Sequence, residues 1–357
     1  MGTRGSETLT GKGRSLPLRT ILFPVFVLVS MILGVELSFN ANKYSGGVAT
    51  FGIPIGLFFM IYPAMTKVHV KEIGRGMKDV KKLGLMVFLN YAIAPFLVAG
   101  LAYIFIFGVF ERMGLIGTQI GSQLLVGIIL LGVAPCIAMV MVWTDLARGN
   151  LALGVSFVAW NSIIQVVTTP FLVYLLARTE LVIEPLVILK SVLLYLVSPL
   201  VAGFLTRFLL GKKMFFTKLL NLLGSVQIIA LLFTIISIFW SEGSGIVDHL
   251  FLVWMVGIIM LSFYFVLFQL GYLSSRKAKF DYPDSTAIGF TVSARDFEIS
   301  IAIAIVAFSA YPYVIFTTAI GPLLEIPLML LLVWLQLSRR KSISMANIQA
   351  GVDLSEK

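Results

Sequence analysis

The stretch SQLLVGIILLGVAPCIAMVMVW, residues 122–143, contains no charged side chain. About 20 predominantly apolar residues are enough to cross the hydrocarbon core of a bilayer as a helix. The run also contains Pro135, and a proline inside a helix removes a backbone donor and breaks or kinks the helix. The stretch therefore predicts a membrane-spanning helix that is interrupted part-way across the membrane, at Pro135 and Cys136.

The rest of the chain repeats this apolar pattern. Of the 357 residues, 59% are hydrophobic and only 12% are charged, whereas soluble domains carry about 25% charged residues. This composition excludes a soluble protein and predicts an all-α membrane protein. We expect ten membrane-spanning helices, at about residues 18–37, 48–66, 83–109, 122–143, 151–177, 186–209, 219–240, 250–273, 286–309 and 313–337.

The distribution of basic residues predicts the orientation of these helices. With the N-terminus inside, 21 of the 27 Lys and Arg residues lie in cytoplasmic segments, and only Lys43, Arg112 and Arg178 lie in outside loops. Short cytoplasmic loops are enriched in Lys and Arg, so both termini are predicted to be cytoplasmic, with the protein in the plasma membrane. The same placement explains the net charge of +10 without a nucleic-acid partner.

Ten spans with both ends on one side divide into two halves of five with opposite orientation, as in inverted-repeat transporters. The halves are predicted at about residues 18–177 and 186–337, within a single domain of residues 18–340. Residues 1–17 are polar and rich in Gly, Ser and Arg, which predicts a disordered cytoplasmic tail. A second cytoplasmic tail is expected at residues 341–357.

The ninth span contains a second interruption, SARDFE at residues 293–298, which places Arg295, Asp296 and Glu298 inside the membrane. Broken helices expose backbone groups that transporters use to hold substrates and coupling ions. Ionisable groups in a span cost about 2.5–3.5 kcal/mol each on insertion scales, so the three residues are candidates for a coupling site. The alternative is a structural cluster in which Arg295 pairs with and neutralises Asp296 or Glu298.

Glu325 is a further candidate in the tenth span. It lies between Pro322 and Pro327, in an otherwise apolar stretch with no cation nearby in sequence. Because loss of water favours the neutral form of a carboxyl group, an unpaired glutamate at this depth is suited to carrying protons.

Cys136 is the only cysteine, which excludes an intramolecular disulfide and a Cys-based zinc or iron–sulfur site within one chain. No cofactor or resident metal is expected. A buried cysteine usually acts as a small apolar side chain, but its position in the break makes Cys136 a candidate substrate ligand. Pro135, Trp143 and Asn161 are expected to support this site.

Four motifs, taken together, resemble those of the Acr3-type arsenite efflux permeases, within the bile acid:sodium symporter superfamily. They are GVAPCIAMVMVWTDLARGN at 132–150, FEISIAIA at 297–304, GPLLEIP at 321–327 and YPAMTKV at 62–68. The resemblance implies ten spans in an inverted five-plus-five repeat, with broken helices crossing at spans four and nine. It also implies export of trivalent arsenic as arsenite, and of antimony as antimonite, in exchange for protons, and leaves the preference between the two open. By motif position, Cys136 matches the family's essential cysteine and Glu325 its essential acid.

Two positions depart from this family. The family usually has paired asparagines before the Phe-Glu motif, where this chain has Arg295 and Asp296. Many members have arginine before the cysteine, where this chain has Pro135. We expect Arg295 to repel a bound sodium ion and to take its place, so that transport does not need sodium.

A second interpretation of the sequence is that the protein carries an organic anion and has no metalloid chemistry. Arg295 would then hold the anion, and Cys136 would only fill space. A membrane enzyme or sensor is disfavoured, because no nucleophile–base, metal-ligand or nucleotide-binding motif is present in the sequence. The oligomeric state stays open.

Overall fold

The structure is a computed structural model that describes residues 18–40, 47, 51–67, 79–137, 139–178, 180–181, 184–211 and 213–349. Across these residues every named element is a helix, which confirms the predicted all-α class. The predicted disordered tail, residues 1–17, lies outside the described residues, and so does the chain from residue 350.

In this part of the chain, six helices are long and apolar enough to cross a membrane. They are Val80–Glu111, Leu151–Ala177, Pro185–Leu210, Phe216–Asp248, Leu250–Lys277 and Pro312–Lys341. Shorter apolar helices occur at Val25–Asn40, Ile53–Pro63, Thr118–Val133 and Phe297–Ala307. Each of these helices overlaps a predicted span, and the chain is a multi-pass helical membrane protein.

Two of the long helices contain wide, π-type turns. One is built from α5 (Val80–Phe88), η3 (Leu89–Ile93), α6 (Ala94–Phe105) and η4 (Ile106–Glu111), the other from α10 (Pro185–Val192), η5 (Leu193–Val197) and α11 (Ser198–Leu210). Pro95 and Pro199 are the second residues of α6 and α11, the segments that follow η3 and η5. Because proline has no N–H and clashes with the preceding turn, a wider turn accommodates it. The turn in η3 contains Asn90, which is completely buried.

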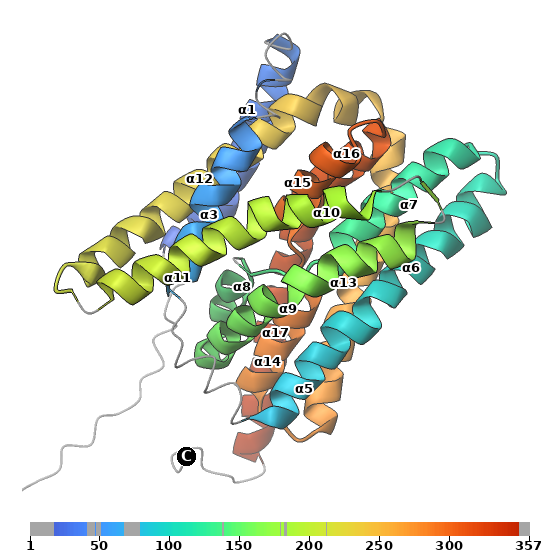
Figure 1. Ribbon diagram of the computed structural model, residues 1–357. Coiled ribbons are helices and arrows are strands. Elements are labelled where there is room, and N and C mark those ends of the chain that lie inside the picture. The colour runs from blue at the N-terminus through green and yellow to red at the C-terminus, as the bar shows by residue number, and fades with distance from the viewer. Residues whose placement is uncertain are drawn as a thin grey trace, which may run out of the picture.

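Four helices form a layer at one side of the molecule (Figure 1): α1 (Leu18–Asn40), α3 (Ile53–Lys67), α11 and α12 (Phe216–Asp248). Within this layer α12 packs along both α1 and α3, and α11 packs on α3. The contact between α1 and α12 is close, because a Cβ atom at Gly34 would lie 2.6 Å from the Cβ atom of Phe239.

All of the predicted site residues lie in the other part of the bundle, outside the layer formed by α1, α3, α11 and α12. Besides α5 and α6 this part contains α7 (Thr118–Val133), α8 (Val140–Leu146), α9 (Leu151–Ala177), α13 (Leu250–Lys277), α14 (Tyr282–Ser293), α15 (Phe297–Ala307), α16 (Pro312–Ala319) and α17 (Gly321–Gln349). Every residue of α7 from Gly121 to Val133 is buried. A helix that is apolar on all sides belongs in the core of the bundle, so the break that ends α7 lies in the interior.

Candidate substrate site at the crossing of two broken helices

The two interruptions predicted from the sequence meet in the structure. The break between α7 and α8 pairs with the break between α14 and α15 as an isolated antiparallel bridge, Pro135 to Arg295. The backbone N–H of Cys136 donates to the Ala294 carbonyl at 3.1 Å, and the N–H of Asp296 donates to the Ala134 carbonyl at 2.9 Å. Each break therefore satisfies backbone groups that the other leaves without a helical partner.

Local sequence explains the extended conformation on one side of this pairing. Ala134 ends α7 with φ −86° and ψ 115°, and it precedes Pro135. A residue before proline is disfavoured in the helical region and favoured in the extended one. On the other side Ala294 ends α14 with φ −67° and ψ 138°. The crossing is thus two short extended links between half-helices.

Arg295 occupies the crossing with its side chain completely buried. Its Nη2 donates to Asn90 Oδ1 at 3.1 Å and to the carbonyl of Val292, and its guanidinium lies 5.6 Å from the ring centroid of Phe263. Among the described residues no carboxylate oxygen lies within 4.0 Å of Arg295. A direct ion pair with Asp296 or Glu298 is therefore absent, and no described residue forms a hydrogen bond with Nε or Nη1.

Asp296 and Glu298 lie at the start of α15, both about 1% exposed. Asp296 caps the helix, because its Oδ1 accepts a hydrogen bond from the N–H of Ile299 at 3.0 Å. A carboxylate at this position is stabilised by the free N–H groups and the dipole of the helix. The Glu298 carboxyl group interacts with that of Asp296, while its Oε1 has no hydrogen-bond partner among the described side chains and backbone groups. The pair places two acidic groups directly beside the crossing.

Glu325 reaches the crossing from α17. Its Oε2 accepts a hydrogen bond from the Tyr264 hydroxyl at 3.3 Å, and its carboxylate faces the backbone N–H of Arg295. Oε1 has no hydrogen-bond partner in the part of the chain that the structure describes, although the side chain is only 1% exposed. The charge of Arg295 acts on Glu325, Tyr264 and Cys136, so these groups belong to one electrostatic cluster.

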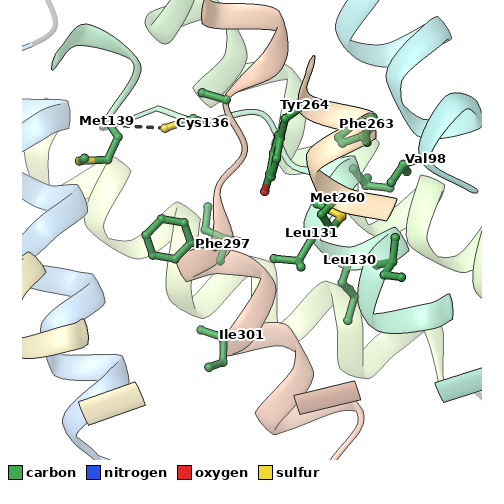
Figure 2. Close-up of a cluster of buried hydrophobic side chains, with 14 of the residues drawn as sticks. Val98, Leu130, Leu131, Cys136, Met139, Met260, Phe263, Tyr264, Phe297 and Ile301 are labelled. Atoms are coloured by element: carbon green, nitrogen blue, oxygen red, sulfur yellow. Dashed lines mark hydrogen bonds between the residues drawn. The ribbon is translucent and has the colours of Figure 1, made fainter. Parts of the chain in front are cut away.

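Cys136 is also about 1% exposed and lies in the α7–α8 link. Its Sγ accepts a hydrogen bond from the N–H of Met139 at 3.3 Å (Figure 2). A thiolate is stabilised by nearby cations and by donors to its sulfur. The backbone N–H of Met139 is such a donor, and Arg295 is such a cation.

Asn90 and Tyr264 belong to the site although the sequence did not single them out. Asn90 donates to Asn161 Oδ1 at 3.4 Å and to the carbonyl of Thr291 at 3.5 Å, while its Oδ1 accepts from Arg295. A single asparagine within the otherwise apolar third span was the available signal for Asn90. No local signal marks Tyr264, because tyrosines are common in membrane helices.

Asn161 and Trp143 have different relations to the crossing. Asn161 joins it through Asn90 and also accepts a hydrogen bond from the Tyr91 hydroxyl at 3.3 Å. Trp143 is completely buried on α8, seven residues beyond Cys136, and its indole N–H finds no hydrogen-bond partner within the described residues. The structure thus links Asn161, but not Trp143, to Arg295 by hydrogen bonds.

Comparison with known proteins places the chain in a family. The profile of the Sodium Bile acid symporter family matches residues 54–249, more than half of the chain. The chain belongs to the Sodium Bile acid symporter family. Membership in this family makes it a transporter rather than an enzyme, as the sequence predicted.

Two arsenical-resistance proteins named Acr3 are among the relatives in this family. The one from Alkaliphilus metalliredigens is 29% identical over 92% of this chain and 95% of the relative. The one from Corynebacterium glutamicum is 29% identical over 88% of this chain and 87% of the relative. An uncharacterized transporter of Synechocystis is 31% identical over 88% of this chain and 86% of its own length. The resemblance to Acr3-type proteins within this symporter family is confirmed.

Proposed function

We propose that this transporter exports trivalent arsenic as arsenite, and trivalent antimony as antimonite, from the cytoplasm in exchange for protons. The observation that carries the proposal is the buried cluster of Cys136, Arg295 and Glu325 at the crossing, together with the similarity to two arsenical-resistance proteins. One thiol, one fixed cation and one carboxylate suit a small, thiophilic, hydroxyl-bearing substrate.

Cys136 is the proposed substrate ligand. Its thiol displaces one hydroxyl of arsenous acid, an As–S bond forms, and the thiol proton leaves with that hydroxyl as water. Hydrolysis by one water reverses the step and frees the substrate. Among the described residues no group of three His, Cys, Asp or Glu side chains is placed to hold a metal ion. Binding through one sulfur keeps the complex reversible, as release requires.

Glu325 is the proposed proton carrier. Its carboxylate faces the crossing but leaves Oε1 without a partner, so it can take up a proton there. A proton taken from outside as the substrate leaves would neutralise the group before the site turns inward again. Tyr264 positions the carboxylate through its hydrogen bond to Oε2.

The proposed topology is ten spans in an inverted repeat. The first half covers about residues 18–177 and the second about 186–337, with the tails at 1–17 and 341–357 in the cytoplasm. The two breaks then fall in the fourth span of each half, since α7 and α8 form one span and α14 and α15 another. This arrangement places the crossing near the middle of the membrane, where transporters of this type bind substrate.

The second candidate function is a carrier of an organic anion. It is favoured by one observation: the nitrogens Nε and Nη1 of the buried Arg295 have no hydrogen-bond partner in the described ranges of the chain. Each of these two nitrogens can donate a charge-assisted hydrogen bond to an anionic group.

Growth of an arsenite-sensitive host distinguishes the two functions. Expression of the chain should restore growth on arsenite and on antimonite, and Cys136→Ser should abolish the effect at equal membrane levels of protein. Resistance that persists in the Cys136→Ser variant would refute the thiol-based site. Absence of any resistance, together with anion uptake that survives Cys136→Ser, would establish the organic-anion carrier.

A further inference from the structure

A line of buried polar side chains runs along α9, and its polar atoms lack partners. Asn161, Gln165 and Thr169 are spaced by four residues, so they lie on one face over successive turns. Their side chains are at most 2% exposed. No described residue forms a hydrogen bond with Asn161 Nδ2, with either polar atom of the Gln165 amide, or with Thr169 Oγ1. We refer to these three residues as the α9 polar stripe.

The lack of partners is specific to this face of α9. The hydroxyl of Ser162 donates to the carbonyl of Val158 at 2.7 Å, and that of Thr168 donates to the carbonyl of Ile164 at 3.0 Å. These bonds to the preceding turn are the usual solution for a hydroxyl inside a membrane helix. Thr169, next to Thr168, does not form one. The Thr169 hydroxyl can therefore form a hydrogen bond with a group outside the helix.

The stripe begins at the crossing. Asn161 Oδ1 accepts a hydrogen bond from Asn90 Nδ2 at 3.4 Å, and Asn90 Oδ1 in turn accepts one from Arg295 at 3.1 Å. From Asn161 the stripe extends by eight residues, about 12 Å along the helix, towards the end of α9 at Ala177. In the proposed orientation this end faces the outside.

Buried polar atoms without partners are costly, and most costly in a membrane interior. Four such atoms on one helix face, closed to water in this conformation, are explained if the face becomes solvated in another conformation of the transport cycle. We propose that, when the transporter opens to the outside, the α9 polar stripe lines a water-filled path from the crossing to the outer surface, along which a small, neutral, hydroxyl-bearing solute leaves. Amide and hydroxyl groups can exchange hydrogen bonds with such a solute without holding it, because none of them carries a charge. The identity of the solute and the outward direction rest on the proposed function, whereas the hydration of the stripe does not.

The single cysteine of the chain allows a direct test of hydration. In a Cys136→Ser background, Gln165→Cys and Thr169→Cys should react with a charged, membrane-impermeant methanethiosulfonate added outside intact cells. The matched control on the same helix is Val167→Cys, because Val167 is 72% exposed on the lipid-facing side of the bundle and should react much more slowly. Failure of either stripe position to react in a folded variant overturns the path. Reaction only when the reagent has access to the cytoplasmic side overturns its direction.

Transport provides the second readout. Gln165→Leu should reduce arsenite export about ten-fold, the effect of losing one buried hydrogen-bonding group, at an unchanged amount of folded protein. Val167→Leu should leave export unchanged. Full export by Gln165→Leu would show that the stripe does not serve the solute. Because the labelling does not involve arsenite, failure of the proposed substrate would not change its result.

Discussion

Replacement of Arg295 by asparagine tests whether a fixed positive charge has taken the place of a coupling cation. In the structure the guanidinium is held by Asn90, by the carbonyl of Val292 and by the ring of Phe263. Asp296 and Glu298 are the acidic groups beside it that could attract a cation. Asparagine at this position removes the charge and, because its side chain is shorter, also the contacts of the guanidinium with Asn90 and Phe263.

The size of the effect follows from the separation of charges. No carboxylate oxygen in the described residues lies within 4.0 Å of Arg295, so a cation held by Asp296 or Glu298 would be somewhat farther from it. Two unit charges about 6 Å apart repel by about 3 kcal/mol at an effective dielectric near 20. Such a repulsion weakens binding of a cation about 100-fold. Arg295→Asn should therefore raise sodium affinity by about this factor.

The assay is arsenite transport in everted vesicles at fixed pH and ionic strength, with sodium replaced by choline. The unmodified protein and Arg295→Lys, which keeps the charge, should be indifferent to sodium. Arg295→Asn should become sodium-stimulated or bind sodium measurably. Sodium-stimulated transport by the unmodified protein would refute the reasoning, because the site would then hold a cation despite the arginine.

Three further predictions follow from the site and its packing. Glu325→Gln should reduce export driven by a pH gradient in everted vesicles to the level of empty vesicles while the protein still inserts, and normal export would move the carrier role to Glu298. A thiol introduced by Lys78→Cys in the Cys136→Ser background should be labelled only from the cytoplasmic side, so labelling of intact cells by an impermeant reagent would reverse the topology. Gly127→Ala should lower the melting temperature in detergent, because the added Cβ would lie 2.5 Å from the Cβ of Thr317. Overpacking of this kind typically costs about 1–3 kcal/mol. An unchanged melting temperature would show that α7 and α16 separate easily.

The features that the sequence predicts correctly are those encoded by neighbouring residues. Long apolar runs specify membrane helices, because the bilayer has no partners for backbone groups other than those within a helix. Pro135 marks the first break, since a proline removes a donor wherever the chain places it. The adjacent charged residues Arg295, Asp296 and Glu298 mark the second. The motifs around Cys136 and Glu325 were enough to indicate the family, because motif recognition also needs only local sequence.

The tertiary structure decides what each buried group faces. Arg295 has an acidic neighbour in sequence, yet its side chain bonds to Asn90, which is 205 residues away, and lies over Phe263 from another helix. Tyr264 meets Glu325 across 61 residues. Such pairings depend on how whole helices pack, and an apolar pattern that directs a helix into the membrane does not specify its neighbours. For the same reason the unpartnered atoms of Gln165 become visible only when every helix around them is in place.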